Sequence, residues 1–305
     1  DDNLTQDQIQ KEYPAVQAAM LKELQTWAKL KCFSRKRRHE AKNIIDTRWV
    51  LKYKWEYPTT DATASGAGAS GNDRPIRPTE PTRTIRARLT VRGFKDTERN
   101  NIDKYAGTST RMSQKVLVSE AVKNNWVIMT TDISKAFLQG VTYEELAKLT
   151  GEPVREVNFF LPASNVPLLR KIPGFEDFDP TKEVLHCDKP GTGLVDAPRA
   201  FSLKLALITK GTLKLLPSRV DPELCMRHEN GKLICIMTKH VDDLKIAGDT
   251  RIVQMVLTVL QQHFGELKVI SADFVNCGVR HQQCPKTFTI HLDQIAFCNN
   301  LRPIA

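Results

Sequence analysis

The 305-residue sequence lacks the features of several protein classes. It has seven Cys, an odd number, and no Cys-x-x-Cys pair. A disulfide framework is therefore not expected, and a reducing compartment fits better. No run of about 18 apolar residues exists, so no membrane span is expected. The acidic and polar start, Asp1 to Asn3, is unlike a signal peptide. Because the chain begins without Met and stops on Arg-Pro-Ile-Ala, we expect a piece of a longer protein.

A zinc site is the less favoured interpretation of the Cys and His residues that lie near one another in the sequence. Their spacing matches none of the usual ligand patterns. We therefore interpret them as separate core or surface residues: Cys277, His281, Cys284 and His291.

The charge balance is basic, with 45 Lys and Arg against 35 Asp and Glu and a formal net charge of +10. This balance suits a polyanionic partner such as nucleic acid, although a basic soluble protein without that role also fits. A basic run covers residues 35–42. It is open to three interpretations: a solvated loop, a phosphate contact or a nuclear-localisation patch.

Hydrophobic periodicity and turn residues predict alternating helices and strands rather than repeats. A stretch rich in Thr, Ala, Ser, Gly and Pro, 58–82, is expected to be a disordered loop. Thr142 and Glu145 form a capping box, and Asn230-Gly231 is a strong hairpin signal. We expect helices at 14–33, 113–124, 142–151, 198–211 and 250–265, and strands at 49–55, 85–94, 127–133, 224–228, 233–240 and 244–247.

Two neighbouring carboxylates, Asp242 and Asp243, fall in a tight turn between strands that look buried. Such like charges repel unless a cation lies between them. Asp132 lies near the end of another apolar strand, so three carboxylates converge if these strands are neighbours. That arrangement suits two-metal phosphoryl transfer with Mg²⁺, or Mn²⁺ as an alternative. An ordinary surface turn is the competing interpretation.

Ordered motifs then carry a resemblance that covers most of the chain, from about residue 21 to residue 300. IDTRWVLKYK, RARLTVRGF, YAGTSTRMS, TDISKAFLQG, GLVDAPRAF and HVDD begin at residues 45, 86, 105, 131, 193 and 240. In this order they resemble the reverse transcriptase of copia-type LTR retrotransposons. The resemblance implies an RNA-directed DNA polymerase that adds dNTPs to a primer on an RNA or DNA template, and neighbouring RNase H and integrase domains in a longer Pol polyprotein.

The resemblance also implies roles for individual residues. Asp132, Asp242 and Asp243 would be the catalytic metal ligands, with the Ile133 carbonyl as a further ligand. Phe137 would be a steric gate against the ribose 2′-hydroxyl. The other residues expected at the dNTP are Arg86, Arg88, Lys135, Ala136, Thr192 and Gly193. Residues expected at the template and primer are Pro198, Arg199, His240 and Val241.

Three departures from the family pattern are visible. His240 replaces a Tyr, Asp196 replaces a Gln, and residues 141–189 form a longer and less similar segment. We expect Asp196 to place a negative charge near phosphates and to weaken binding. A decayed fold that binds nucleic acid without polymerising is therefore one alternative function, and a metal-dependent nuclease is another.

The expected fold is α/β, of the α+β type: a right-hand polymerase with fingers, an antiparallel-sheet palm and the start of a thumb. We expect a helical leader at 1–41, fingers and palm at 42–265, and the thumb or connection from 266 to 305. Within the fingers, the second predicted strand should project Arg86, Arg88 and Arg92 from one face. The expected location is the cytoplasm or a virus-like particle, with the nucleus as an alternative.

Overall fold

A computed structural model describes residues 3–56 and 82–301, and its contacts divide the chain into two compact units. The first unit comprises Asp1–Asp96 and Glu156–Cys187, and the second comprises Thr97–Arg155 and Asp188–Ala305. The expected disordered loop lies outside the described residues, except for Thr82, which belongs to a strand. The functional divisions expected after residues 41 and 265 stay predictions.

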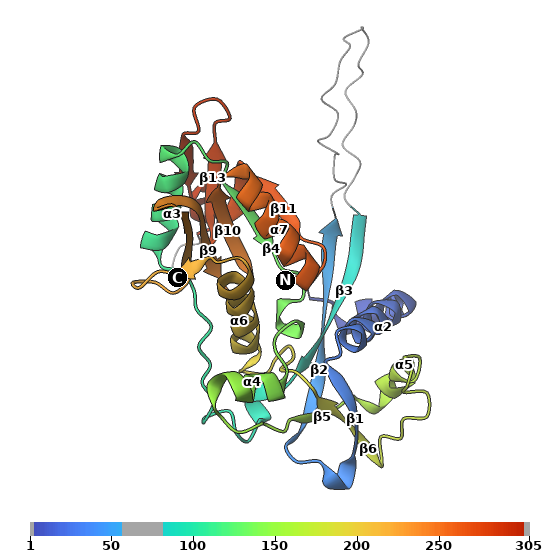
Figure 1. Cartoon of the computed structure of the whole chain (residues 1–305). Helices are drawn as coiled ribbons and strands as arrows, with labels where there is room; N and C mark the ends of the chain where they lie inside the picture. The colour runs from blue at the N-terminus through green and yellow to red at the C-terminus, as the bar shows by residue number, and fades with distance from the viewer. Residues whose placement is uncertain (1–2, 57–81, 302–305) are drawn as a thin grey trace. The chain divides into compact units, whose positions relative to one another are not determined.

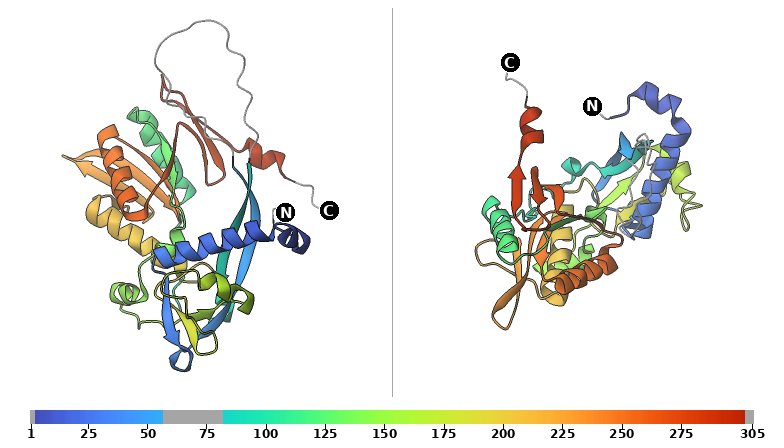
Figure 2. Two further views of the ribbon diagram at one scale, coloured as in Figure 1. Left: turned by 90° about the vertical axis from the view of Figure 1, so that its right-hand side faces the viewer. Right: turned by 90° about the horizontal axis from the view of Figure 1, so that it is seen from above.

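The first unit contains a five-stranded sheet with one helix across its face (Figures 1 and 2). Strand order is β1 (Phe33–Arg37), β6 (Glu183–Cys187), β5 (Asn158–Phe160), β2 (Ile44–Glu56) and β3 (Thr82–Val91), and only the β2–β5 pair is parallel. Helix α2 (Tyr13–Lys29) confirms the predicted periodicity by burying Val16, Met20, Leu24 and Trp27. The ring of Trp27 packs edge-on against Phe159, with 5.9 Å between centroids. The shorter helices here are α1 (Gln6–Lys11) and α5 (Val166–Leu169).

Strand β3 shows where the alternating pattern holds and where it ends. Arg86 and Arg88 are exposed, whereas Ala87 and Leu89 between them are buried, so the two arginines share one face as predicted. The expectation that Arg92 continues this face is wrong because the strand ends at Val91. The Arg92 guanidinium instead lies 3.1 Å from an Asp46 carboxylate oxygen.

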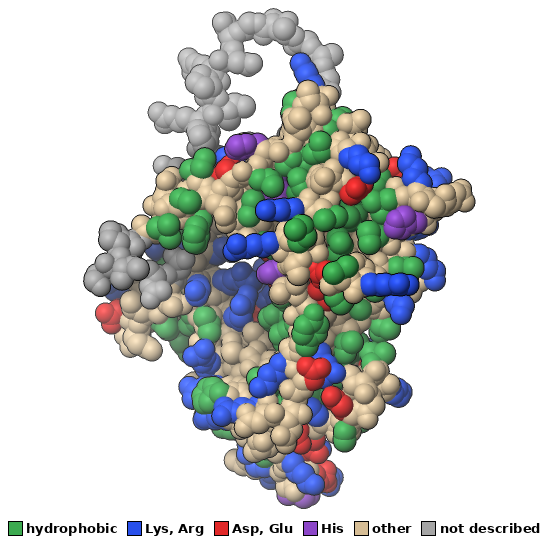
Figure 3. Space-filling model, turned by 90° about the vertical axis from the view of Figure 1, so that its left-hand side faces the viewer, with side chains coloured by type: hydrophobic (Ala, Val, Ile, Leu, Met, Phe, Trp, Pro, Cys, Tyr) green, Lys and Arg blue, Asp and Glu red, His purple; other side chains and the backbone are tan. Residues whose placement is uncertain are grey.

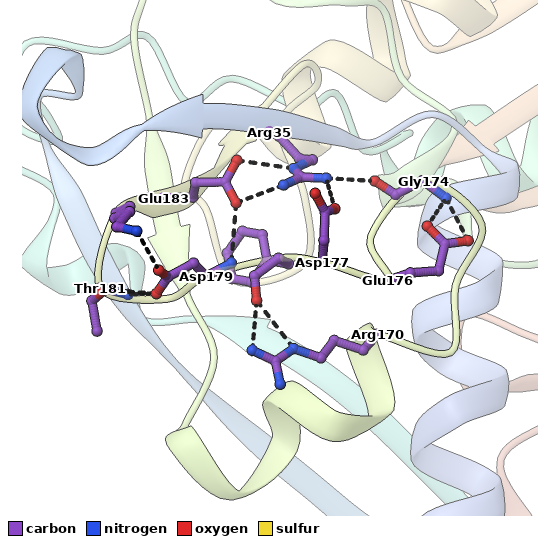
Figure 4. Close-up of polar contacts among 10 residues, drawn as sticks. Arg35, Arg170, Gly174, Glu176, Asp177, Asp179, Thr181 and Glu183 are labelled. Carbon is purple, nitrogen blue, oxygen red and sulfur yellow. Dashed lines mark hydrogen bonds and ion pairs between the residues drawn. The ribbon is translucent and has the colours of Figure 1, made fainter.

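Basic residues of the 35–42 run form ion pairs with carboxylates of the same unit. The first residues of this run form strand β1 rather than a solvated loop. Arg35 donates to both carboxylate oxygens of Glu183, at 2.9 and 2.7 Å, and to Asp177 at 2.6 Å (Figure 4). The Lys36 ammonium lies 2.8 Å from Glu156. These two cations therefore serve the fold and are not open to a phosphate.

Glu156 makes this ion-paired region sensitive to acid. Its carboxylate accepts from Lys36, from the Lys42 backbone N–H at 2.9 Å and from Asn158, which lowers the pKa of Glu156 to about 2. Because this folded-state pKa lies below the ordinary value of 4.5, the interaction stabilises the fold above pH 4.5 and is lost as the pH falls toward 2. We expect Glu156→Gln to lower the free energy of unfolding by about 1 kcal/mol at pH 6, a modest value because the side chain is partly exposed. Urea unfolding at several pH values should show this difference shrinking below pH 4.5. A difference that stays constant down to pH 3 would contradict the assignment.

The second unit is built on a six-stranded, antiparallel sheet with helices on both faces (Figures 1 and 2). Strand order is β11 (Lys268–Ser271), β4 (Met129–Asp132), β10 (Asp243–Gly248), β9 (Lys232–His240), β8 (Leu224–Glu229) and β7 (Leu216–Pro217). Helix α3 (Arg111–Lys123) covers one face, where Leu117 and Ala121 meet Ile236. Helices α6 (Ala197–Leu207) and α7 (Thr250–Phe264) cover the other. The predicted α/β class with an antiparallel sheet is confirmed.

The predicted capping box and the predicted hairpin turn are both present in this unit. The Thr142–Glu145 capping box opens α4 (Tyr143–Thr150), and Gly151 closes it with φ 75°. Asn230 and Gly231 both have positive φ in the turn between β8 and β9. The predicted end of the 198–211 helix is wrong in detail: α6 ends at Leu207 and continues as a π-helical turn, Ile208–Thr212, that passes Gly211.

The remaining elements are short. A three-stranded sheet joins β12 (Asp273–Asn276), β13 (Val279–Gln283) and β14 (Ile290–Asp293), and α8 (Ile295–Asn299) follows. Single 3₁₀ turns occupy Arg38–Glu40, Gly93–Lys95, Ala136–Leu138 and Ala163–Asn165. Within the described ranges, no helix has the length and apolar character needed to cross a bilayer.

Candidate catalytic carboxylates

The site begins with the turn between β9 and β10. His240 pairs with Asp243, so the turn itself consists of Val241 and Asp242. Val241 has φ 58°, and Asp242 is not among the residues of positive φ. This is the pattern of a type II′ turn, which normally has Gly at its first central position. A β-branched residue there is strained, and such strain is typical of functional sites.

Sheet register brings the third carboxylate to this turn. Asp132, the last residue of β4, is the Cα partner of Asp243 on β10. The backbone N–H of Ile133 donates to the Asp242 carbonyl oxygen at 3.3 Å. The condition under which the sequence predicts converging carboxylates is therefore met: β4 and β10 are neighbours, and Asp132 and Asp243 lie opposite each other where β4 ends and β10 begins.

Electrostatics show that these carboxylates interact. The pKa of Asp243 is raised, first by burial and then by the negative charges of Asp242 and Asp132. A cation among them would remove this repulsion, and carboxylate oxygens are the ligands that Mg²⁺ prefers. The donor set therefore fits a divalent metal. The side chains are not preset as a cage, because no group of three His, Cys, Asp or Glu in the described ranges is already arranged around one point. Metal binding at Asp132, Asp242, Asp243 and the Ile133 carbonyl stays a prediction.

The loop after β4 holds the residues predicted to contact a nucleotide. Lys135 has φ 57° and precedes the 3₁₀ turn in which Ala136 is buried and Phe137 is half-buried. Sequence reasoning missed the residue that fixes this loop. The Gln139 side-chain amide donates to the Ser134 carbonyl at 2.9 Å and to the Phe264 carbonyl at 3.0 Å, which ties the loop to the end of α7. The sequence gives no local signal for the contact with Phe264, because that residue lies 125 positions away.

Gly140 allows this loop to pack closely on α6. A Cβ at this position would lie 2.9 Å from the Ala200 Cβ and 3.0 Å from backbone atoms of Ala200 and Phe201. We expect Gly140→Ala to lower the free energy of unfolding by about 1–3 kcal/mol, since the loop must move off the helix. Gly211→Ala is the matched control, because its added Cβ would meet no atom within 4 Å beyond its chain neighbours and its own helical turn. Equal denaturation midpoints for the two variants would contradict this packing.

The segment before α6 holds Thr192, which is half-buried, and Gly193, which is exposed with φ 98°. Pro198 lies in the first turn of α6, as predicted. Arg199 is held in ion pairs with Asp103 and Glu152, each at 3.3 Å. Contacts of these residues with a nucleotide, template or primer stay predictions.

The expectation that Asp196 presents a negative charge to phosphates is wrong. Its side chain is fully buried and forms an ion pair with Arg155. Its backbone carbonyl accepts the first helical hydrogen bond of α6, from the Ala200 N–H at 2.9 Å. Asp196 is therefore a buried, charge-compensated residue at the start of the helix.

Two further groups of predicted residues are placed by the structure. His240 is half-buried at the end of β9, and its Nδ1 has no hydrogen-bond partner in the described part of the chain. Arg86 and Arg88 belong to β3 in the first unit, whereas the three aspartates belong to the second. A nucleotide contact for these arginines stays a prediction.

The proteins that this chain resembles in sequence are retrovirus-related Pol polyproteins. No family model matches the chain. It is 29% identical over 186 residues to the retrovirus-related Pol polyproteins from transposons RE2 and RE1 of Arabidopsis thaliana, a match that covers 59% of this chain and 11% of each relative. The chain thus spans about a tenth of the length of the curated relatives it matches. The predicted resemblance to retrotransposon Pol proteins is confirmed.

Two solved structures that align with this chain contain bound nucleic acid. Telomerase from Candida albicans, in complex with a fragment of telomeric RNA, aligns with a TM-score of 0.48 and 9% identity over 95% of this chain and 52% of that chain. A foamy viral protease–reverse transcriptase in complex with double-stranded DNA aligns with a TM-score of 0.36 and 11% identity over 72% of this chain and 31% of that chain.

Proposed function

We propose that this chain is the fingers and palm, with the start of the thumb, of an RNA-directed DNA polymerase from a retrotransposon Pol polyprotein. The observation that carries the proposal is the register of β4 and β10, which sets Asp132 opposite Asp243 beside the strained turn of Asp242. Similarity to retrovirus-related Pol polyproteins supports it independently. Its partners would be dNTPs and an RNA or DNA template with a primer, and its cofactor Mg²⁺ or Mn²⁺.

In this proposal the chain supplies the carboxylates that would bind metal and the side chain that would select the sugar. The three carboxylates supply negative oxygens where β4 ends and β10 begins, and these two strands and the β9–β10 turn hold their backbones in place. Divalent metal bound there would stabilise the attacking primer hydroxyl and the leaving pyrophosphate. Phe137, placed by the Gln139-anchored loop, would crowd a ribose 2′-hydroxyl and favour dNTPs.

Surface charge is consistent with a polyanionic partner. Lys and Arg side chains predominate over Asp and Glu on the face drawn in Figure 3, in keeping with the net charge of +10. Binding to a primer–template would then weaken steeply with salt. Protein binding releases counterions from the phosphates, and added salt opposes that release.

A product analysis separates polymerisation from the alternatives. A 5′-labelled primer on an RNA template is incubated with the chain and Mg²⁺, with and without dNTPs. The proposal predicts longer products only when dNTPs are present. Shorter products without dNTPs would support a nuclease instead. Salt-sensitive binding with an unchanged primer would support a fold that binds nucleic acid without polymerising.

A further inference from the structure

A cavity in the second unit lies beside β10, the strand that begins at Asp243. It has a volume of about 420 Å³ and lies against α3, β10 and the β12–β14 sheet. Val118, Val279 and Leu292 form apolar walls. Three polar side chains in its lining are almost fully buried: Lys245, Asn276 and His281.

The Lys245 ammonium enters this cavity without an anionic partner. The residue is 1% exposed, and its Nζ lies 3.1 Å from His281 Nε2. His281 Nδ1 lies 3.0 Å from the Val279 carbonyl oxygen. That oxygen can only accept, so Nδ1 carries the proton and Nε2 accepts from Lys245. No carboxylate of residues 3–56 or 82–301 lies within ion-pair distance of Lys245. A buried ammonium with one neutral acceptor is costly until an anion joins it.

Asn276 requires a hydrogen-bond donor, whereas Lys245 requires an acceptor. Asn276 is 3% exposed, and its Nδ2 donates to Thr130 Oγ1 at 3.3 Å. Thr130 Oγ1 gives its own proton to the Leu244 carbonyl at 2.9 Å, so it must accept from Asn276, and this fixes the orientation of the amide. The Asn276 Oδ1 atom is then a buried acceptor with no donor in the described part of the chain. Such an acceptor requires an N–H or O–H group.

The rim of the cavity favours negative ligands. Arg111 and Lys115, both exposed, project from the first turns of α3, and Asp293 is the acid on the opposite side. Among the lining residues, two exposed cations and one buried cation therefore outnumber one carboxylate. The charge of Asp243, outside the lining, also acts on Cys277. The surroundings attract an anion, and the apolar walls suit a ligand with a hydrocarbon body.

We infer that this cavity binds a small organic carboxylate that also carries an N–H or O–H donor. The carboxylate would accept from Lys245, the donor would reach Asn276 Oδ1, and the apolar part would contact Val118 and Leu292. The inference does not depend on polymerase activity, since neither Lys245 nor Asn276 is among the residues assigned to the carboxylate site.

Three matched probes test the two polar requirements. By isothermal titration, 3-hydroxybenzoate should bind, whereas benzoate lacks the donor and 3-hydroxybenzamide lacks the charge. Each of the latter two should bind at least about tenfold more weakly, the usual loss when a buried polar group stays unpaired. Absence of 3-hydroxybenzoate binding, or equal affinity for all three probes, would overturn the inference.

Single substitutions test whether Lys245 and Asn276 contact the probe. Lys245→Met should weaken 3-hydroxybenzoate at least about tenfold, because the hydrogen-bonded charge is gone. Asn276→Leu should remove the preference for 3-hydroxybenzoate over benzoate. Lys123→Met, at the exposed far end of α3, is the control and should change nothing. Unchanged affinity in Lys245→Met would overturn the assignment.

A footprint on the wild-type chain covers the case in which a variant does not fold. Cys277 lines the cavity and is exposed, and Cys298 is exposed outside it. Saturating 3-hydroxybenzoate should slow alkylation of Cys277 by iodoacetamide while leaving Cys298 unchanged. Equal rates at Cys277 with and without the probe would count against the site.

Discussion

Asp242→Asn is expected to abolish nucleotide incorporation while the chain stays folded. The side chain is half-buried at the turn, and the structural contact of this residue is made by its backbone carbonyl, which accepts from Ile133. Asn keeps that contact and the side-chain shape but removes the charge. Loss of a carboxylate that holds catalytic metal costs several kcal/mol in the transition state, so incorporation should fall roughly a thousandfold or more.

The same substitution should leave stability unchanged or slightly raised. Asp243 has an elevated pKa partly because Asp242 is negatively charged, so removing that charge relieves repulsion in the metal-free fold. Thermal unfolding and titration with Mn²⁺ separate the two effects: the midpoint should hold and metal affinity should fall. Glu229→Gln, at the other end of the β8–β9 pair, is the control. Incorporation by Asp242→Asn equal to that of the control would exclude Asp242 from catalysis.

Asp196→Gln, which introduces the residue of the copia-type pattern, is expected to destabilise the fold rather than to restore function. Asp196 is fully buried and ion-paired with Arg155, whose guanidinium also lies 3.1 Å from Glu98. Replacing only the aspartate leaves a largely buried guanidinium with its main partner gone. Breaking a buried pair from one side typically costs about 3–5 kcal/mol. Urea unfolding should therefore show a large fall in the free energy of unfolding.

A double-mutant cycle isolates this pair. Arg155→Gln alone should also destabilise, and the double variant should lose less than the sum of the two single changes because no uncompensated charge remains. Glu152→Gln is the comparison, since the Arg199–Glu152 pair is more exposed at Glu152 and should contribute less than about 1 kcal/mol. Additive losses in the cycle would mean that Asp196 and Arg155 do not act as a pair.

Local chemistry accounts for what the sequence predicts well. Helix α7 has apolar residues at helical spacing, and Gly265 with φ 81° lies at its end. The Asn230-Gly231 turn and the Thr142 capping box depend on neighbours a few residues away. The approach of the carboxylates could be predicted because Asp132 lies at the end of one apolar strand and Asp242–Asp243 at the turn between two others, so one pairing of strands was enough to bring them together. Their catalytic roles are what the family resemblance implies.

Long-range partners explain what could not be predicted. Strand β11 pairs with β4, and Arg155 meets Asp196 across 41 residues of sequence. Lys245 lies between apolar residues of β10 and gives no sign that its partner is His281. Likewise, the basic run at 35–42 has its carboxylates at 156, 177 and 183. In each case the deciding contact lies outside any local window of sequence.

The most direct measurement is elongation of oligo(dT) on poly(rA) by the wild-type chain with dTTP and Mg²⁺ or Mn²⁺, with a metal-free reaction in parallel. The proposed arrangement of Asp132, Asp242 and Asp243 predicts primer elongation that requires the metal. A primer that stays the same length with either metal, while the chain binds the same duplex in a salt-sensitive manner, would contradict it.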